Sequence, residues 1–557
     1  MNSIYVRIRE NYGWKLYQKN SINFWFSGYL VNNKTVEDLL EDAIKFQKTN
    51  QINIDTLSNW LKTLSGHFAF VIESDENWCF SAVDRVCSIP LFEKKINEGY
   101  LFSNYASYLK EEGSKINMNA LLEISMSGFS LGRKTLYTNL NRFLAGECSL
   151  LMNGELNRNY YHSYMPQPDI KKNEEKLIKE LTTVLLSVLN KILNNIDNRQ
   201  LVIPLSAGND SRIIASGFRK LGYENVICFS YGREGNFEVK TSEEIAKRLN
   251  YKWVYVPDKI KSKRAFFLSE IYKKYVEDFE SFASVPNVQD IYEIYELKML
   301  GVIDNDAVII NGNSGDFITG GHIPSELDFK KSASSIDNFS WDLFLEKHYS
   351  IWRKLRSHDN DKIIISELKR IFSSRFDVNS NNKFKDYSVI ESMELIGRQS
   401  RYVMNQQRAY EFFGYDWRLP LWDNELLDFW ESVPPRFKIN QKLYKKTLIE
   451  NNWGEVWNDI KVNNKIIRPF SLFFLRAALK AIIFPLGKKR WRSLEKNIFV
   501  YWMHPSYARA VESYKNVLLD NRGQRNTISW LADQYVKKIG YKDVIEVSRM
   551  VKNKNIQ

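Results

Sequence analysis

The hydrophobic positions divide the chain into two parts with different periodicity. Over roughly the first 160 residues, apolar and aromatic residues form short runs separated by turn-forming residues, which is typical of β-strands. The polar tetrapeptide at 74–77 separates two aromatic-rich runs and indicates a hairpin, so we expect an antiparallel sheet. The expected strands are Phe24–Leu30, Phe68–Glu73, Trp78–Val83, Tyr100–Ser103 and Glu147–Met152, with helices at Val36–Lys48 and Ala120–Met126.

From residue 173 onward, helical and strand patterns alternate. This alternation is typical of a doubly wound parallel sheet, and the chain after it is largely helical. The expected elements are the helix Glu174–Leu193, the strand Leu201–Leu205, a helix with apolar residues at Ile213, Ile214, Phe218 and Leu221, the strand Val226–Ser230, the helix Glu238–Leu249, and the strands Trp253–Val256 and Ala307–Ile310. For a chain of 557 residues we expect two domains, 1–165 and 173–557.

The composition indicates an ordinary globular protein, because 44% of the residues are hydrophobic and 26% are charged. The four cysteines form no C-x-x-C pair, which argues against a disulfide framework and a thiolate metal site and fits a reducing cytoplasm. Met1–Glu10 has no apolar core, and the most apolar window, Leu472–Leu486, is interrupted and too short to cross a bilayer. We therefore expect a soluble cytoplasmic protein.

The positive charge is concentrated in one segment. The net charge is +13, and residues 461–509 contain eleven Lys or Arg against one acid, Glu495. Within it an apolar helical stripe at 472–483 precedes the basic run 488–492. The segment 472–492 is either a helix that contacts an anionic membrane surface or a core-facing helix with a solvated cationic end. No recognition motif accompanies the charge, so we expect no nucleic-acid partner.

Small and polar residues follow the first strand of the second part. In Leu205-Ser206-Ala207-Gly208-Asn209-Asp210-Ser211, backbone amides and hydroxyls can converge on an anion at the start of the next helix. Asp210 would repel phosphate unless a divalent cation lay between them, which makes it a candidate Mg²⁺ ligand. A simple tight turn with a capping side chain is the alternative. A second Gly-rich run, 311–316, follows the strand Ala307–Ile310, and ligands of parallel sheets lie at such strand ends.

Several stretches occur in the order found in one known family. Ser206–Ser211 resembles the SGGxDS pyrophosphate loop of the asparagine synthetase family, whose members cleave ATP between the α and β phosphates. Phe229–Gly232 resembles the strand end that reads adenine, and Gly312–Phe317 resembles the GEGxDE loop. Further similar stretches are Gly66–Ile72, Asp84–Phe92, Thr135–Tyr137, Leu144–Glu147, Tyr160-Tyr161, Gly320-Gly321, Asp416–Asp423 (ExRxPFLD), Lys445 or Lys446, and Lys465 (RxKxxF).

The resemblance implies a fold, cofactors and residue roles. The first domain would be an Ntn-type antiparallel β-sandwich with flanking helices, and the second a HUP-like ATP-pyrophosphatase domain with a doubly wound parallel sheet and a helical extension. ATP and Mg²⁺ would be the bound cofactors. The implied site residues are Asp210 and Asp316 for the metal; Leu205, Ser206, Gly208, Asn209, Asp210, Ser211, Ser230, Gly232, Gly312 and Gly315 for the nucleotide; and Lys465, Asp416 and Lys445 for catalysis.

Two of these roles have structural alternatives. Lys465 would stabilise negative charge on the acyl-adenylate and the tetrahedral intermediate, or it is an exposed lysine in a basic run. Asp416 and Arg418 would act in catalysis, or they form a buried structural ion pair.

The chain departs from the family at both reaction centres. Glutamine-hydrolysing members carry a cysteine after the initiator methionine, where this chain has Asn2, and Ser27 stands where an oxyanion-forming asparagine is expected. We expect no glutaminase activity, unless a misassigned start hides a cysteine. Asn313 stands where ammonia-using members carry glutamate, and a neutral amide is a poor base.

We therefore expect an ATP-dependent amide-forming ligase that adenylates a carboxylate and transfers the acyl group to ammonia or an amine. Loss of the cysteine resembles the β-lactam synthetase and lasso-peptide cyclase branches, and also asparagine-synthetase-like proteins of bacterial surface polysaccharides. The substrates would be small-molecule, peptide or saccharide carboxylates and amines, and a homodimer stays open. The alternatives are a glutamine-hydrolysing asparagine synthase with an unusual amino terminus and a catalytically silent nucleotide-binding scaffold.

Overall fold

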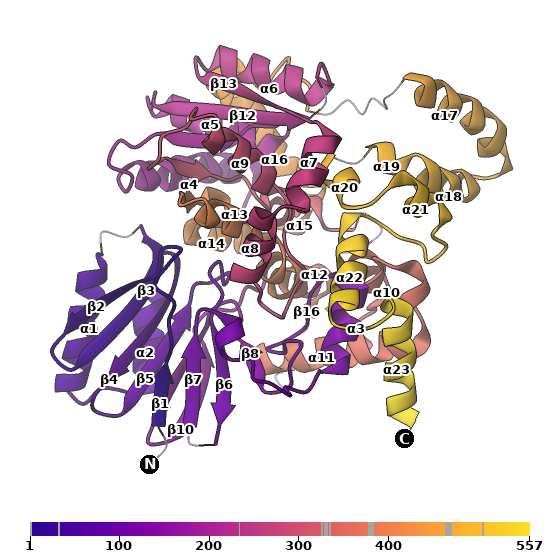
Figure 1. The fold of residues 1–557 in the computed structure, drawn as a ribbon. Helices are drawn as coiled ribbons and strands as arrows, with labels where there is room; N and C mark the ends of the chain where they lie inside the picture. Colours follow the sequence, from indigo (N-terminus) through magenta and orange to yellow (C-terminus); the bar gives the residue numbers. More distant parts are fainter. Residues whose placement is uncertain are drawn as a thin grey trace.

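The computed structural model describes residues 3–31, 34–97, 99–232, 234–324, 327, 332–333, 336–376, 384–462, 470–503 and 506–556. The first part of the chain forms two sheets, and the second part forms a parallel sheet surrounded by helices (Figure 1). Between them, residues 161–173 contain no helix or strand.

A six-stranded antiparallel sheet is the larger of the two amino-terminal sheets. Alternation along its strands sends Phe24, Phe70 and Phe80 to one face, where they pack under α1 (Val36–Lys48) and α2 (Ile54–Lys62). The other face carries Val71 and joins the main hydrophobic core. In spatial order the strands are β10 (Glu155–Tyr160), β9 (Glu147–Met152), β5 (Trp78–Val83), β4 (Gly66–Ser74), β3 (Ile22–Leu30) and β2 (Lys15–Lys19).

The second amino-terminal sheet is mixed rather than purely antiparallel. Its order is β1 (Ser3–Val6), β7 (Gly99–Ser103), β6 (Phe92–Ile96) and β8 (Leu140–Arg142), and β1 runs parallel to β7. This corrects the expectation of an antiparallel architecture throughout. No tight hairpin joins β1 to β7, because more than 90 residues separate them along the chain, so the usual reason for antiparallel pairing is absent.

The amino-terminal part shares a core with the end of the chain. Helix α3 (Met118–Ser127) is buried along nearly its whole length, and it packs against α22 (Thr527–Lys538) and α23 (Val544–Ile556). Leu121, Trp530 and Val547 belong to the same hydrophobic cluster. The two parts of the chain are therefore joined by apolar packing and not only by the connecting segment.

The central sheet is fully parallel and has the order β13 (Lys252–Pro257), β12 (Val226–Gly232), β11 (Leu201–Pro204), β14 (Val308–Ile310) and β17 (Asp416–Arg418). The doubly wound sheet expected from the alternation is thus present. The connections run outward from β11 to β13 and then return to β14, so the topology switches between β11 and β14. Because crossovers between parallel strands are right-handed, this strand order places α5 (Asn209–Lys220) and α6 (Phe237–Arg248) on one face and α9 (Ile291–Met299) on the other.

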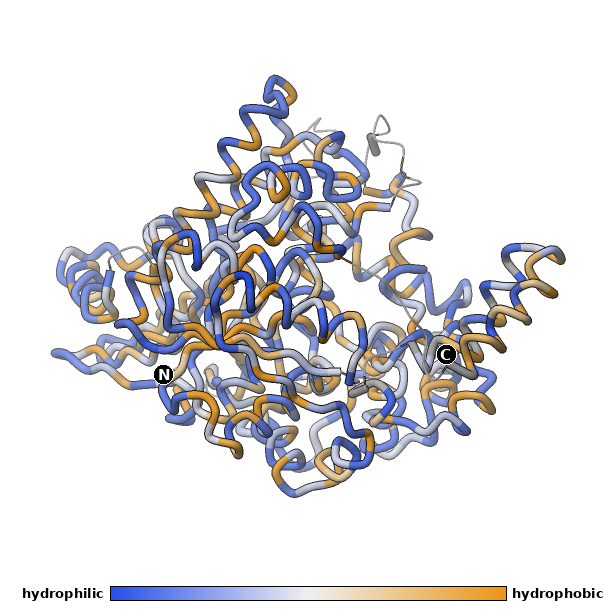
Figure 2. Tube along the Cα trace, turned by 90° about the horizontal axis from the view of Figure 1, so that it is seen from above, coloured by the Kyte–Doolittle hydropathy of each residue, from blue (hydrophilic) through white to orange (hydrophobic). Residues whose placement is uncertain are grey.

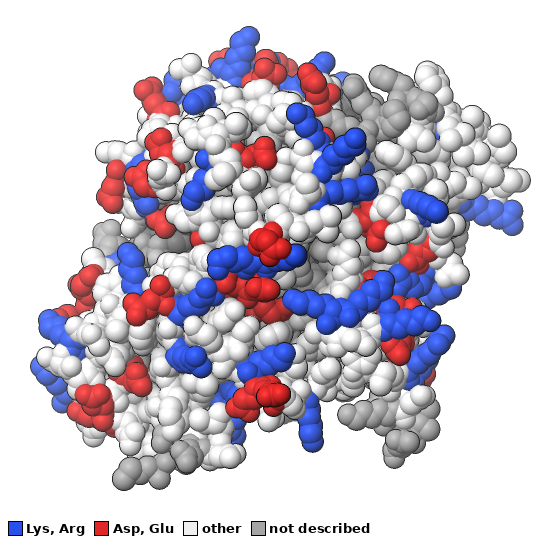
Figure 3. All heavy atoms as spheres, viewed as in Figure 1, with Lys and Arg blue, Asp and Glu red and all other residues white. Residues whose placement is uncertain are grey.

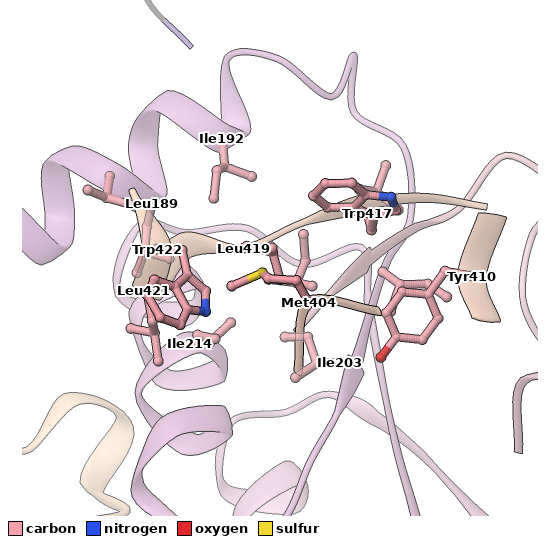
Figure 4. Packing of buried hydrophobic residues seen from close by; sticks show 14 of the residues in the cluster. Leu189, Ile192, Ile203, Ile214, Met404, Tyr410, Trp417, Leu419, Leu421 and Trp422 are labelled. Carbon is pink, nitrogen blue, oxygen red and sulfur yellow. The ribbon is translucent and has the colours of Figure 1, made fainter. Parts of the chain in front are cut away.

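Apolar residues fill the space around this sheet. Ile203 of β11, Ile214 of α5 and Trp417 of β17 belong to one buried cluster with Leu189 and Ile192 of α4 (Glu174–Leu193), as Figure 4 shows. In the hydropathy view, hydrophobic residues concentrate in the interior of the molecule (Figure 2).

Helices make up most of the remaining chain. In order they are α7 (Ile260–Phe267), α8 (Glu270–Asp278), α10 (Asp342–His348), α11 (His358–Arg375), α12 (Asp386–Glu394), α13 (Gln407–Phe412), α14 (Asn424–Ser432), α15 (Pro435–Lys438), α16 (Lys442–Asn451), α17 (Phe470–Ile483), α18 (Lys488–Ile498), α19 (Val500–Met503), α20 (Ser506–Val511) and α21 (Tyr514–Leu519); the short strands β15 (Ser332–Ala333) and β16 (Phe384–Lys385) pair with each other. Within the described part of the chain, every helix is too short or too polar to span a bilayer.

Candidate functional site

The two Gly-containing loops meet at the topological switch of the parallel sheet. One loop follows β11 and leads into α5, whose N-cap is Gly208. The other follows β14 and leads into the π-helical turn η2 (Phe317–Gly321). Since β11 and β14 are adjacent parallel strands, their carboxyl ends bring both loops to the same edge of the sheet.

Hydrogen bonds from backbone amides to side chains of the same segment fix the first loop. The Ser206 amide donates to Ser211 Oγ (2.9 Å), and the Gly208 amide donates to Ser206 Oγ (3.1 Å). From beneath, the buried guanidinium of Arg212 donates to the Ala207 carbonyl (2.7 Å). The first amides of α5 have no partner within the helix, so this turn presents donors and the positive end of a helix dipole to an anion.

Asp210 and Asp316 lie side by side although 106 residues separate them. The Asp316 amide donates to Asp210 Oδ2 (2.9 Å), and the hydroxyl of Tyr444 on α16 donates to Asp210 Oδ1 (3.2 Å). Such close approach requires glycine in the second loop. A Cβ on Gly315 would lie 2.5 Å from the Asp210 carboxyl, and one on Gly312 would lie 3.0 Å from the backbone of Asp210 and Ser211.

The electrostatics of this pair suit a divalent cation. Burial, together with the charge of Asp316, raises the pKa of Asp210 to about 7. Two carboxylates so close together repel each other, and a bound cation would relieve this repulsion. The Asp316 side chain is 57% exposed, so it opens toward solvent, and carboxylate oxygens are the ligands that Mg²⁺ prefers. The donor set therefore fits Mg²⁺.

The buried carboxylate of Glu394 is linked to Asp316 through His322. Glu394 is fully buried; its Oε1 lies 2.5 Å from His322 Nδ1, and its Oε2 lies 3.2 Å from His348 Nε2. His322 Nε2 in turn contacts Asp316 Oδ2 (3.0 Å). Burial lowers the pKa of His322, but its hydrogen bonds to Asp316 and Glu394 outweigh this and raise it to about 9. Partial loss of solvation raises the pKa of Asp316, whereas the hydrogen bond and charge of His322 bring it below its ordinary value.

A polar cavity of about 280 Å³ adjoins the second loop. The side chains of Asn313, Asp316, Arg398 and Gln406 contribute to its lining. Asn313 Nδ2 donates to Gln406 Oε1 (2.6 Å), and Gln406 Nε2 donates to the buried carboxylate of Asp290. An ionised carboxylate accepts hydrogen bonds but cannot donate them, so Asp290 fixes the orientation of the Gln406 amide and, through it, that of the Asn313 amide. Among the described residues Asn313 Oδ1 has no hydrogen-bond partner, and it is therefore available as an acceptor.

The candidate adenine-binding residues Ser230 and Gly232 lie at the carboxyl end of β12. Ser230 is buried; its hydroxyl lies within hydrogen-bond distance of both the Leu205 carbonyl (2.9 Å) and Ser242 Oγ, and it accepts from Trp253 Nε1 (3.0 Å). The Gly232 carbonyl accepts from the Tyr255 hydroxyl (2.8 Å). The Ser230 side chain is thus engaged within the protein and ties the strand end to the first loop.

The structure does not bring Asp416 to the two loops. Asp416 begins β17 opposite Val308, at the amino end of the sheet, and its carboxylate pairs with Arg199 (2.7 Å). The expected pair with Arg418 is therefore replaced by a pair with Arg199. The buried Arg418 lies over the ring of Tyr29 instead, with Cζ 4.1 Å from the ring centre.

The candidate lysines have different positions. Lys445 is exposed and donates to the Asn440 carbonyl (2.8 Å), and Lys446 pairs with Glu174 (2.6 Å). Tyr444, on the same helix, is the residue that reaches Asp210, and sequence reasoning missed it although its neighbour was singled out. Lys465 lies outside the described residues.

The amino-terminal part contacts the central sheet through Tyr29. Its hydroxyl bonds to His67 Nδ1 (2.7 Å) and accepts from the Leu419 amide (3.1 Å).

All four cysteines are buried, and burial raises the pKa of each thiol. None of them has the electropositive, accessible surroundings that a nucleophilic thiolate needs. The cysteines are Cys79, Cys87, Cys148 and Cys228.

Comparisons with known proteins agree with the geometry of the second part. Residues 196–450 match the family model described as asparagine synthase. A stretch of 97 residues is 33% identical to a protein of Acanthamoeba polyphaga mimivirus named "Probable asparagine synthetase [glutamine-hydrolyzing]", and it covers 17% of this chain and 18% of the viral protein. The chain thus matches less than a fifth of that relative's length.

A solved structure titled "Structure of NMN synthetase from Francisella tularensis" aligns with 42% of this chain and 97% of its own, at 12% identity and a TM-score of 0.21. A TM-score of 0.21 carries no inference about the fold. The family-model match supports a relationship between residues 196–450 and the asparagine synthases, and the viral match supports a relationship between the chain and the asparagine synthetases.

Proposed function

We propose that this protein is an ATP-dependent amide-forming ligase that adenylates a carboxylate, releases pyrophosphate and transfers the acyl group to ammonia or an amine. The observation that carries the proposal is the meeting of Asp210 and Asp316 at the switch point of the parallel sheet, within the 196–450 match to the asparagine synthase model. Two carboxylates beside an anion-binding helix start suit a nucleotide that arrives with a divalent cation.

Each loop has its own part in the proposed reaction. The hydroxyls of Ser206 and Ser211 and the first amides of α5, which begins after Gly208, would bind the phosphates that leave as pyrophosphate. Asp210 and Asp316 would hold Mg²⁺, which supplies charge neutralisation for the departing phosphates. Gly315 lets the two carboxylates approach, and His322 holds the Asp316 carboxylate in position.

The polar cavity beside Asn313 is the proposed entry for the nucleophile. Because Asp290 orients the Gln406 amide, Asn313 presents a carbonyl oxygen that accepts a hydrogen bond. Such an acceptor recognises an N–H donor, as an amine or ammonia offers, and would orient the nucleophile without removing its proton. A second group of the protein or the substrate itself would take that proton.

We propose further that the chain hydrolyses no glutamine. Each of its four cysteines is buried with a raised thiol pKa, so none is suited to attack an amide. The amide nitrogen would then come from free ammonia or from an amine of the substrate.

Measurement of pyrophosphate release tests the ligase. Purified protein would be incubated with ATP, Mg²⁺, a panel of carboxylic acids and ammonia or amines, and AMP and pyrophosphate would be quantified. We expect release with at least one acid, and loss of release in Asp316→Asn but not in Asp304→Asn, an exposed control away from the loops. Failure to bind ATP together with no release would favour the scaffold alternative. Formation of glutamate from glutamine would contradict the absence of glutaminase activity.

A further inference from the structure

Helix α17 exposes an apolar face to solvent. It stands away from the rest of the molecule in Figure 1, and none of the residues 472–488 is buried. Phe473 is 41% exposed, Phe474 68%, Leu475 48% and Ile482 64%. This finding argues against a core-facing helix, the second of the two interpretations of this segment.

The exposed positions fall on one side of the helix. The less exposed residues Leu472, Arg476, Leu479 and Ile483 recur at spacings of three and four, and they mark the side that faces the protein. The opposite side contains only apolar residues except for Lys480. A helix on the surface of a globular protein ordinarily turns its polar side to water, so the polarity of α17 is reversed. The exposed residues of α17 are Phe473, Phe474, Leu475, Ala477, Ala478, Lys480, Ala481 and Ile482.

The apolar surface continues into the next turn. Phe484 and Leu486, in the short 3₁₀ turn Phe484–Leu486, are 45% and 59% exposed. Together with α17 they form a ridge of contiguous apolar side chains, which we call the 473–486 ridge. In Figure 3 the described atoms on the visible face of α17 are mostly white, and the helix contains no acidic residue.

Basic residues flank the ridge. Lys480 lies at its border, and Lys488, Arg490 and Arg492 follow it on α18, all of them exposed. None of these four has an ion-pair partner among the residues that the structure describes. Arg476, on the less exposed side of α17, differs from these four because it pairs with Glu495 and thereby ties α17 to α18.

We propose that the 473–486 ridge docks on the surface of an anionic lipid bilayer. The apolar side chains would enter the boundary between head groups and acyl chains, and the flanking cations would lie at the level of the anionic head groups. Lys480 can keep its ammonium in the head-group layer while its methylenes lie along the ridge. The length of α17, 14 residues, suits a helix that lies in the interface and not one that crosses it.

The flanking charge favours lipid over a second copy of this chain. A two-fold dimer built on the ridge would bring each set of basic residues against its own equivalent, or close to it, without acidic residues to compensate. An anionic surface compensates all of these cations at once. The ridge does not include the residues of the Asp210–Asp316 site, so the proposal stands independently of the ligase activity.

Vesicle flotation tests the proposal. Full-length protein would be mixed with vesicles of phosphatidylcholine alone or of phosphatidylcholine with phosphatidylglycerol. We expect flotation with the anionic vesicles only, and a decrease as salt rises. Phe474→Gln/Ile482→Gln should abolish flotation, while Leu300→Gln/Leu519→Gln, which alters two exposed leucines elsewhere, should leave it unchanged.

The charge contribution has its own variants. In Lys488→Gln/Arg490→Gln/Arg492→Gln, binding to anionic vesicles should weaken by about fivefold for each charge removed. The matched control Lys273→Gln/Lys274→Gln changes two exposed lysines on α8 and should bind like the original chain. Thermal unfolding should not change in either variant, because none of these side chains is buried.

Three results would overturn the proposal. Absence of flotation with anionic vesicles is the first, and equal binding of the Phe474→Gln/Ile482→Gln variant is the second. The third is a dimer in solution that this variant disrupts, without vesicle binding by the original chain, since a second copy would then cover the ridge.

Discussion

Removal of the Asp210 charge should stabilise the metal-free protein while it destroys the proposed activity. In Asp210→Asn the shape of the side chain is kept and the charge is lost. One amide oxygen can still accept from the Asp316 backbone, and the Tyr444 hydroxyl can turn to accept from the new amide nitrogen. The substitution therefore changes electrostatics far more than packing.

The size and the pH dependence of the effect follow from the raised pKa. The folded protein holds the Asp210 proton up to a pKa of about 7, against an ordinary value of 3.8. Between these two values the folded state binds more protons than the unfolded state, so this group makes stability fall as pH rises, and above pH 7 its full cost is present. About three pH units correspond to at most ~4 kcal/mol.

Thermal unfolding in a chelator measures the effect. We expect Asp210→Asn to melt at a higher temperature than the original chain at pH 8, and the difference to shrink toward pH 5. Asp316→Asn is the matched comparison, because His322 lowers the pKa of Asp316 and its carboxylate is favoured in the folded state. That variant should melt at a lower temperature at pH 8. Addition of Mg²⁺ and ATP should raise the melting temperature of the original chain but of neither variant.

The reasoning is refuted if Asp210→Asn is less stable than the original chain in chelator at pH 8, or if the difference does not depend on pH. Either result would mean that burial and the neighbouring Asp316 carboxylate do not disfavour the charged form of Asp210 in the folded protein.

The close packing of the site leads to three further expectations. Gly315→Ala should reduce pyrophosphate release by about 10²-fold, because its Cβ would displace the opposing carboxyl, whereas Gly397→Ala, with its nearest neighbour at 3.4 Å, should retain activity. Glu394→Gln should destabilise the protein by about 3–5 kcal/mol, measured by denaturant unfolding, because it leaves buried histidines and nearby cations without their anion. Asn313→Asp sets a carboxylate against Gln406 Oε1, so we expect a lower melting temperature. In the pyrophosphate assay this variant should need a higher amine concentration for half-maximal release. An unchanged dependence on amine concentration would contradict the orientation assigned to the Asn313 amide.

Local sequence pattern was sufficient for several of the regular elements. The bounds of β5, β9, α1 and α4 agree with the periodicity, because each is long enough for alternation or for a helical stripe to register. The pattern did not predict β1, β2, β6, β8, β10 or α2. Most of these elements are short or mostly polar, and tertiary pairing rather than propensity stabilises them.

Local sequence pattern predicted the parts of the candidate site that lie within one continuous loop. The loop around Asp210 follows from its strand, its turn and the next helix. Asp210 and Asp316, 106 positions apart, were named together only through the family resemblance, and Tyr444, 234 positions from Asp210, was not predicted, because no local pattern reports such distant contacts. The same reason explains why the partner of Asp416 is Arg199 and not the neighbouring Arg418.

A crystal structure with Mg²⁺ and an ATP analogue that resists cleavage between the α and β phosphates tests the central claim most directly. The account predicts a metal ion with oxygen ligands at about 2.0–2.1 Å from both Asp210 and Asp316, and the triphosphate against the amides that begin α5. A nucleotide bound elsewhere, or a metal that neither carboxylate touches, would contradict it.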